Sequence, residues 1–289
     1  MPGDSIKEIV RREASRLREA GIPSHGLEAQ LLAAFALGMS REDLLLAFDD
    51  TVSYESQMRI EGLTARRIAG EPMAYIRGVK EFWSLPFRVD GRVMIPRPDT
   101  EVLVDRCLRH ARGRLGGQRV VAVDVGTGSG AIACALAREI EDALVIAVDI
   151  SREAAGLARE NIRELGLSGR VWTVVGDLLG PFRRRADFHI VAANLPYIPS
   201  AELRYLPEGI REHEPWTALD GGSDGLEVIR RLLYDSEGYV RSGGLLALEV
   251  DDSQVEEVVG IVKGSLVYAD TGVDVDTAGF KRVVWAMKP

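Results

Sequence analysis

Three glycines at alternate positions lie between an apolar, β-branched run and an alanine-rich run. The run Val120–Val123 is typical of a buried parallel strand, and Ala131–Ala137 is typical of the start of a helix. Between them, Gly126, Gly128 and Gly130 permit a sharp turn and let a ligand approach the backbone N–H groups. The N-terminus of the helix adds unpaired donors and a partial positive charge. The stretch therefore predicts a loop that binds a nucleotide-type cofactor.

Two classes of cofactor fit this loop. Gly126, Gly128 and Ala131 satisfy the dinucleotide fingerprint G-x-G-x-x-G/A. Asp124, however, comes directly before the loop. A carboxylate at this position would repel a negatively charged pyrophosphate but attract a cationic ligand. With Gly130 the pattern becomes Asp-x-Gly-x-Gly-x-Gly, which resembles motif I of the S-adenosylmethionine (SAM) methyltransferases, whose ligand carries a positive sulfonium and an amino group. A tight strand-to-helix turn without a ligand is the remaining interpretation.

Acidic residues follow the next two predicted strands. Asp149 ends the strand 143–149, where its carboxylate can accept hydrogen bonds from both ribose hydroxyls of an adenosine. The alternative for Asp149 is an acid near the N-terminus of the next helix. Asp177 and Leu178 follow the strand 171–175, where the edge and face of an adenine would lie. Asp177 can accept from the exocyclic amine, and a plain turn acid is the alternative.

A fourth buried strand, 187–193, delivers a polar residue to the same edge of the sheet. Asn194 is followed there by Leu195, Pro196 and Tyr197. An Asn-x-Pro turn that leaves a strand is one interpretation. Beside a SAM loop, the segment resembles motif IV of the amino-methylating enzymes, whose pattern is Asn/Asp/Ser-Pro-Pro-aromatic.

The chemistry of amide methylation explains these residue types. An amide nitrogen is a poor nucleophile because its lone pair is delocalised. The Asn194 oxygen and a backbone carbonyl of Leu195 or Pro196 can hold both N–H groups, which aims the lone pair at the methyl group and stabilises the developing positive charge. The Tyr197 ring can contact the planar acceptor group by stacking or through its edge. We therefore expect direct in-line transfer with no covalent enzyme intermediate, no metal and no assigned general base.

Composition argues against several other classes of protein. The chain has 289 residues, is 46% hydrophobic and carries a net charge of −8, which does not favour direct nucleic-acid binding. Only two cysteines, Cys107 and Cys134, occur, and this fits a reducing cytosol without a disulfide framework. No apolar run reaches membrane-spanning length, and the four histidines show no metal-ligand spacing. We expect a cytoplasmic protein with no metal and no membrane contact.

The predicted elements divide the chain into three parts. Residues 1–78 contain a capping box at Ser5–Glu8 and four helices, which predict a small bundle for partner recognition. Residues 79–98 form an aromatic linker with a predicted hairpin turn at Asp90-Gly91. In residues 99–289, helices alternate with strands and predict an α/β, Rossmann-like domain with a doubly wound sheet. The strands are expected at residues 119–124, 143–149, 171–175, 187–193, 244–250, 265–270 and 280–287.

Further segments narrow the resemblance to one family. These are Glu71–Gly78, Glu81–Trp83, Ile95–Glu101, Glu214–Leu219 and Gly221–Gly225. Together with the glycine loop and the Asn194 segment, they resemble the HemK/PrmC family, the peptide chain release factor glutamine-N5 methyltransferases. The likeness covers nearly the whole chain and implies a helical N-terminal domain, a hairpin linker and a SAM-binding domain.

The resemblance also implies an activity and assigns residues to it. The family transfers methyl from SAM to the glutamine of the Gly-Gly-Gln loop of release factors, which leaves S-adenosylhomocysteine. The substrate glutamine is assigned to Asn194, Leu195, Pro196 and Tyr197. SAM is assigned to Asp124, Gly126, Thr127, Gly128, Ser129, Gly130, Asp149, Asp177, Leu178 and Asn194.

Two positions depart from the family pattern. Leu195 replaces the first proline of Asn-Pro-Pro-Tyr, so the segment is less stiff and gains an N–H that needs a partner. A lost preorganisation of about 0.5–1 kcal/mol would slow the enzyme without abolishing it. Asp251 stands where the family usually has glycine, with no predicted consequence.

Other functions stay open at this point. Asn-Leu-Pro-Tyr is similar to the motif of the rRNA adenine dimethyltransferases, so an adenine-N6 methyltransferase that acts on RNA or DNA is the alternative. The acidic composition and the segment 71–101 count against it. A SAM-binding protein with weakened catalysis is a third hypothesis, and a nicotinamide dehydrogenase ranks last. Arg97, Asp99 and Glu101 are interpreted equally as site closure, as release-factor contacts or as a stiff helix start.

Overall fold

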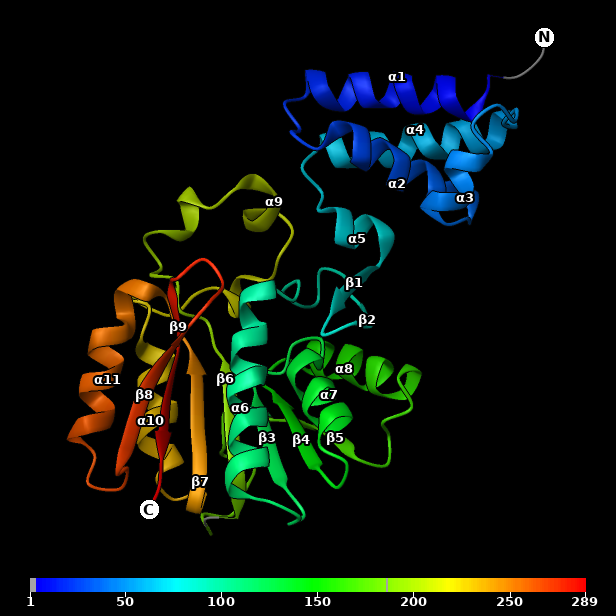
Figure 1. Ribbon diagram of the computed structural model, residues 1–289. Coiled ribbons are helices and arrows are strands. Elements are labelled where there is room, and N and C mark those ends of the chain that lie inside the picture. Colours follow the sequence, from blue (N-terminus) through cyan, green and yellow to red (C-terminus); the bar gives the residue numbers. More distant parts are fainter. Residues whose placement is uncertain (1–3, 186) are drawn as a thin grey trace. The chain divides into compact units, whose positions relative to one another are not determined.

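The computed structural model describes residues 4–185 and 187–289 (Figure 1). The chain divides into two compact units. One unit comprises the residues up to Gly78 together with Pro207–His213, and the other comprises Val79–Leu206 and Glu214–Pro289. In the described part of the chain, no helix combines the length and the apolar character needed to cross a membrane.

The first unit is a helical bundle. At its start, Ser5 and Glu8 form the predicted capping box, in which each side chain accepts from the other residue's backbone N–H. Buried aliphatic side chains such as Ile9 and Leu32 form the core. The four predicted helices are present, and a short additional helix follows Pro72. The helices are α1 (Ile6–Glu19), α2 (His25–Leu37), α3 (Arg41–Leu46), α4 (Tyr54–Ile68), α5 (Met73–Arg77) and α9 (Glu208–Arg211).

A β-hairpin opens the second unit, but its turn lies elsewhere than predicted. Strands β1 (Val79–Phe82) and β2 (Leu85–Arg88) pair antiparallel through a turn at Trp83 and Ser84. Both turn residues have left-handed backbone, with φ of 52° and 56°, as a type I′ turn requires. The predicted turn at Asp90-Gly91 is therefore wrong, and no strand follows it. The Asp90 carboxylate instead accepts two hydrogen bonds from the guanidinium group of Arg92, which fixes a separate turn.

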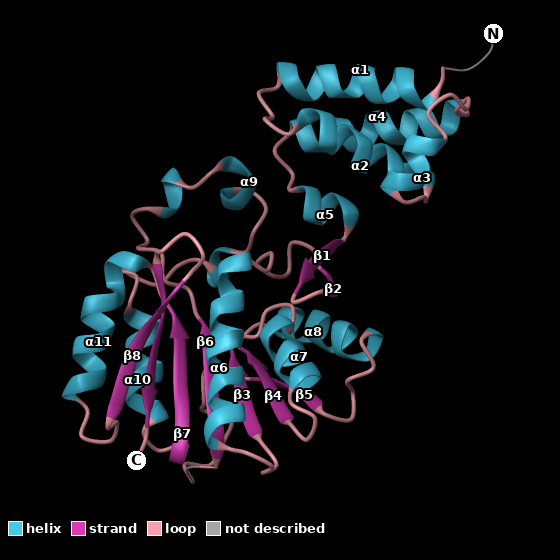
Figure 2. Ribbon diagram, viewed as in Figure 1, coloured by secondary structure: helices cyan, strands magenta, loops and turns pink. Residues whose placement is uncertain are grey.

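Seven strands form one sheet in the order β5-β4-β3-β6-β7-β9-β8. The strands β3 to β7 run parallel, and the C-terminal pair is antiparallel, so the predicted mainly parallel, doubly wound sheet is confirmed (Figure 2). Their bounds are β3 (Val121–Val125), β4 (Leu144–Asp149), β5 (Val171–Val175), β6 (Phe188–Asn194), β7 (Val240–Glu249), β8 (Asp270–Val275) and β9 (Lys281–Met287).

The prediction of a strand at 265–270 is wrong, because β8 begins only at Asp270. Its register with β9 places Gly272 opposite Trp285. A Cβ on Gly272 would lie 2.3 Å from the Trp285 ring, so glycine makes room for this indole. A close approach of this kind leaves no periodic signal in the sequence.

Alternate residues of each strand face two helical layers. On one face, residues such as Ala122 and Ile190 pack with helices α6 (Glu101–Arg114), α7 (Ala131–Glu139) and α8 (Arg152–Glu164). On the other face, residues such as Val123 and Val191 pack with α10 (Glu227–Ser236) and α11 (Val255–Gly264). The strand order reverses between β3 and β6, which opens a crevice at their carboxyl ends where ligands bind in sheets of this kind.

Candidate active site

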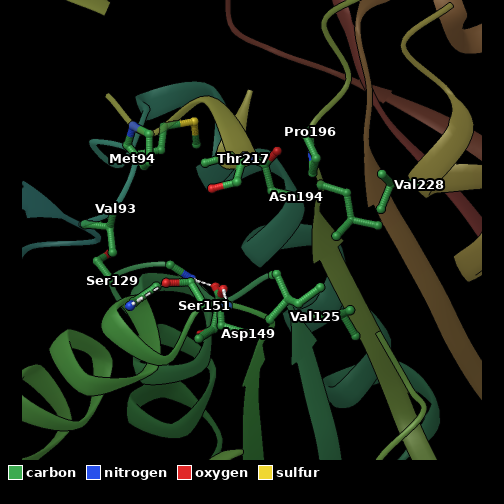
Figure 3. A pocket seen from close by; sticks show the side chains of 18 of the residues that line it. Val93, Met94, Val125, Ser129, Asp149, Ser151, Asn194, Pro196, Thr217 and Val228 are labelled. Carbon is green, nitrogen blue, oxygen red and sulfur yellow. Dashed lines mark hydrogen bonds between the residues drawn. The ribbon is translucent and has the colours of Figure 1, made fainter. Parts of the chain in front are cut away.

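A cavity of about 470 Å³ lies at the carboxyl ends of the central strands (Figure 3). It is lined by the glycine loop after β3, by the ends of β4 and β6, and by two irregular segments around Met94 and Trp216. Its volume falls in the range of small-molecule sites. The lining includes Met94, Thr100, Gly126, Thr127, Gly128, Ser129, Asp149, Asp177, Leu178, Asn194, Leu195, Pro196, Trp216 and Thr217.

The glycine loop has the backbone that its sequence predicts. Gly126, Gly128 and Gly130 all have positive φ, at 76°, 55° and 84°. No described atom lies within 4 Å of a Cβ built on Gly128, so its backbone borders open space in the cavity wall. Gly130 does not line the cavity, because it packs against Ala158 of α8, 3.3 Å from the position of its absent Cβ. Gly130 thus serves the turn and the helix contact.

Asp124 lies behind the loop and not in the cavity wall. Its Oδ2 accepts from the Thr127 hydroxyl at 2.6 Å and from the Ala133 N–H at 3.1 Å. Its Oδ1 has no hydrogen-bond partner among the described residues, and burial raises the pKa of this carboxyl group to about 7. The geometry therefore gives Asp124 a role in shaping the loop, and its direct contact with a cofactor stays a prediction.

Asp149 ends β4 and faces the cavity. Its two oxygens accept from the N–H groups of Gly128 and Ser151, each at 2.9 Å. Burial raises the pKa of Asp149, whereas these two N–H groups lower it. Each carboxylate oxygen keeps a second lone pair, so the group can still accept from two hydroxyls.

Asp177 and Leu178 also line the cavity, at the end of β5. Asp177 Oδ2 accepts from the guanidinium group of Arg231 at 2.5 Å. Leu178 has a left-handed backbone with φ of 47° and buries its side chain. Both residues thus line the same cavity as the glycine loop, Asp177 pairs with a cation, and their contact with an adenine stays a prediction.

Asn194 ends β6, the strand beside β3, and its backbone oxygen lies 3.5 Å from the position of a Cβ on Gly126 of the glycine loop. Its Nδ2 donates to the Thr100 hydroxyl at 3.0 Å, which turns the side-chain oxygen the other way. Leu195 and Pro196 line the cavity beside it, whereas Tyr197 does not. The Tyr197 ring packs into the apolar cluster on the α10 and α11 side, and burial raises the pKa of its hydroxyl to about 12.

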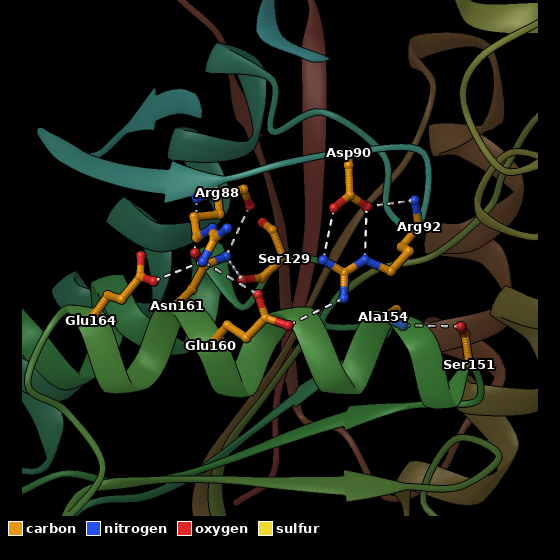
Figure 4. Close-up of polar contacts among 9 residues, drawn as sticks. All are labelled: Arg88, Asp90, Arg92, Ser129, Ser151, Ala154, Glu160, Asn161 and Glu164. Carbon is orange, nitrogen blue, oxygen red and sulfur yellow. Dashed lines mark hydrogen bonds and ion pairs between the residues drawn. The ribbon is translucent and has the colours of Figure 1, made fainter. Parts of the chain in front are cut away.

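Asn161 is a functional residue that the sequence analysis missed (Figure 4). This buried side chain of α8 donates to the Ser129 carbonyl at 2.8 Å and to the Arg88 carbonyl at 3.1 Å. It also accepts from the Arg88 N–H at 2.8 Å. Asn161 therefore fastens the hairpin to the glycine loop, and an asparagine within a helix gives no sequence signal of this role.

Arg97 ties together the two irregular segments of the cavity wall. It donates to Glu214, whose other oxygen accepts from the Ile95 N–H at 3.3 Å. Burial raises the pKa of Glu214, and the neighbouring guanidinium group lowers it. The pair joins the segment around Met94 to the one around Trp216, so it stabilises the shape of the wall.

Asp99 and Glu101 have structural partners as well. Asp99 forms an ion pair with Arg282 of β9 at 3.3 Å. Glu101 accepts from the Trp83 N–H of the hairpin turn at 3.0 Å. Both contacts anchor the start of α6.

Comparisons with known proteins agree with this architecture. A family model described as the PrmC N-terminal domain matches residues 8–78, and a methyltransferase domain model matches residues 122–213. In the solved structures, the hMettl16 catalytic domain in complex with a MAT2A 3′UTR hairpin aligns with a TM-score of 0.56 at 13% identity, and the match covers 78% of this chain and 81% of that one. This likeness shows the fold alone.

Curated relatives are similar over nearly the full length. The release factor glutamine methyltransferase of Bradyrhizobium diazoefficiens is 37% identical over 286 residues, 99% of this chain and 96% of that protein. The release factor glutamine methyltransferase of Moorella thermoacetica is 39% identical over 284 residues, 98% of this chain and 99% of that protein. The chain therefore belongs to the release factor glutamine methyltransferase family.

Proposed function

We propose that this protein transfers a methyl group from SAM to the side-chain amide nitrogen (N5) of the glutamine in the Gly-Gly-Gln motif of peptide chain release factors. The observation that carries the proposal is that Asp149 and Asn194, at the ends of the two strands that flank β3, face one cavity together with the glycine loop (Figure 3). A cofactor acid and an amide acceptor are the two groups that this reaction requires.

The residues of the cavity fit SAM. Gly128 leaves open space where a side chain would stand, so a ligand can approach the loop backbone. Asp149 keeps lone pairs for two ribose hydroxyls. Asp177 and Leu178 line the same cavity and would contact the edge and the face of the adenine. When bound, SAM supplies a methyl group activated by the positive sulfonium.

Asn194 would hold the glutamine amide. Its Nδ2 is bound to Thr100, so its oxygen can accept one N–H of the substrate. A backbone carbonyl of Leu195 or Pro196 would accept the other N–H. This pair orients the nitrogen lone pair and stabilises the positive charge that develops on nitrogen, and the extra proton leaves to water. Tyr197 would act from behind this segment, because its ring does not line the cavity.

The helical unit up to Gly78 would recognise the release factor. It exposes large apolar side chains at its surface, among them Leu46 at 88% and Tyr54 at 77% relative exposure. These exposed apolar side chains are available for contact with a partner protein. Residues 79–98, which begin with the β-hairpin of β1 and β2, would act as the linker, and residues 99–289 as the SAM-dependent methyltransferase domain. Action on a translation factor implies a cytoplasmic enzyme, and the proposed in-line transfer has no step that requires a metal.

The test is transfer of labelled methyl from SAM to purified release factor. A release factor whose Gly-Gly-Gln glutamine is changed and a sample of rRNA serve as parallel acceptors. Label on the release factor that disappears in the changed variant is the expected result. Label on rRNA alone would favour adenine methylation, and SAM binding without any transfer would indicate a binding protein.

A further inference from the structure

Asn194 and Glu249 occupy paired positions at the carboxyl ends of two neighbouring strands. Strands β6 and β7 run parallel, and their register places Asn194 directly beside Glu249. The Glu249 side chain is buried, with the residue only 3% exposed. Thr100, at the start of α6, is 5% exposed and lines the cavity beside Asn194. A buried carboxyl group thus lies behind the proposed substrate-binding amide.

A hydrogen bond connects Asn194 with Thr100, and Glu249 lies beside both. The Asn194 amide nitrogen donates to the Thr100 hydroxyl oxygen at 3.0 Å. The Glu249 carboxyl group lies close enough to Thr100 and Asn194 for both polar side chains to lower its pKa. The second carboxyl oxygen, Oε2, has no partner among the described residues.

The direction of each hydrogen bond follows from the donors and acceptors available. An ionised carboxylate only accepts, so the Thr100 hydroxyl, whose oxygen accepts from Asn194, can direct its own hydrogen toward Glu249. The Thr100 oxygen then offers a lone pair to the Asn194 NH₂ group. Because the amide is planar, its oxygen is left to face the cavity. The carboxylate thereby sets which end of Asn194 a substrate meets.

We propose that Glu249 is a positioning residue, which acts through Thr100 to present the Asn194 oxygen to the substrate amide. This inference rests on the proposed function and adds a regulating group to the same site. A protonated Glu249 becomes a donor, so it can reverse the Thr100 hydroxyl and release the Asn194 amide group to turn. Methyl transfer then depends on the protonation state of a group that never touches the substrate.

The charges around Glu249 define the pH range of this dependence. Burial raises the pKa of Glu249 to about 7, the polar side chains of Thr100 and Asn194 lower it, and the charge of Asp99, in the segment before α6, raises it. Arg282 of β9 lowers it, and the Tyr197 hydroxyl lies close enough to interact with the carboxylate. Because the carboxylate form is the positioning form, transfer is expected to rise as pH increases through about 7.

Two substitutions at one position separate positioning from packing. Thr100→Val keeps the branched shape and removes the hydroxyl, whereas Thr100→Ser keeps the hydroxyl. The Thr100 side chain makes no capping hydrogen bond to α6, so neither change removes a helix cap. We expect Thr100→Val and Glu249→Gln to slow single-turnover transfer about tenfold or more, with SAM affinity unchanged. Thr100→Ser is expected to keep most of the wild-type transfer rate. In Glu249→Gln, the decrease of the transfer rate below about pH 7 is expected to disappear.

The outcomes distinguish this inference from the proposed function. The positioning role would be overturned if Thr100→Val and Thr100→Ser lost the same fraction of the methyl-transfer rate. It would also be overturned if Thr100→Val transferred methyl at the wild-type rate. A second measurement is independent of the acceptor: protection of the Asn194 NH₂ protons from exchange in ¹⁵N spectra, assigned by their loss in Asn194→Ala. Protection in the wild type that is lost in Thr100→Val supports the positioning role even if no release factor is labelled, in which case the proposed function fails alone. Unprotected NH₂ protons in the wild type would overturn the positioning role.

Discussion

The Leu195 side chain lies against Gly126 of the glycine loop. A Cβ added to Gly126 would lie 3.0 Å from Leu195 Cδ2, and Leu195 itself is only 4% exposed. The residue that replaces the family's proline therefore supports the loop from within the protein. Its side chain contributes packing that a proline at the same position would not provide.

Gly126→Ala is expected to weaken SAM binding about tenfold or more. Alanine at φ of 76° is strained, and its methyl group would displace Leu195 at 3.0 Å. Gly166→Ala is the matched control, because Gly166 has φ of 73° but no described atom within 4 Å of its Cβ position. Titration calorimetry with SAM compares the two variants. Wild-type affinity in Gly126→Ala would show that the loop does not need this close approach.

Leu195→Pro is expected to reduce the free energy of unfolding by about 1–3 kcal/mol, although it restores the family motif. The substitution removes buried aliphatic carbon beside Gly126 and leaves a cavity. Leu195→Met conserves volume and is expected to change stability by less than about 1.5 kcal/mol. Urea unfolding measures both. A proline variant as stable as the wild type would contradict the packing role of Leu195.

Asp149→Ala is expected to weaken SAM binding about tenfold or more, because it removes a charged acceptor in the cavity wall. Asp177→Ala serves as the comparison. Asp177 is about half exposed and already pairs with Arg231, so its loss is expected to change the affinity by about threefold or less. Equilibrium dialysis with labelled SAM distinguishes the two. A larger effect at Asp177 would move the ribose-binding role away from Asp149.

Asn194→Ala is expected to reduce methyl transfer about a hundredfold or more while SAM still binds. The substitution removes the oxygen that would accept a substrate N–H but leaves the glycine loop and Asp149 in place. Single-turnover transfer and SAM affinity are measured on the same preparation. Parallel loss of both would assign Asn194 a structural role.

Asp124→Asn is expected to stabilise the protein at pH 8 by about 2–4 kcal/mol relative to the wild type. Burial raises the pKa of Asp124 from its ordinary 3.8 to about 7, so the folded state keeps a proton that the unfolded state loses. Wild-type stability therefore falls as pH rises from about 4 to about 7. Asparagine keeps an oxygen for Thr127 and Ala133 and carries no charge. Urea unfolding across this pH range checks the prediction, which a pH-independent difference between the two proteins would contradict.

The local patterns of the sequence determined most of the fold and the principal site residues. Strand and helix periodicity fixed the alternating elements, because each element buries one face at a spacing of about 2 or 3.6 residues. The glycine loop, Asp149 and Asn194 could be found because each directly follows such a strand. The carboxyl ends of parallel strands meet at one edge, so their proximity followed from the topology.

The tertiary structure decided what joins segments distant in sequence. Asn194 and Thr100 are 94 residues apart, and Asn161 and Arg88 are 73 apart, so no local pattern encodes either contact. The hairpin turns at Trp83-Ser84 and not at Asp90-Gly91, because Arg92 binds the Asp90 carboxylate and both turn residues adopt a backbone that their types rarely favour. Burial, which only the folded chain creates, raises the pKa values of Asp124 and Glu249 to about 7. Residue types thus specified the chemistry that the site can perform, and packing specified which groups are oriented and charged to perform it.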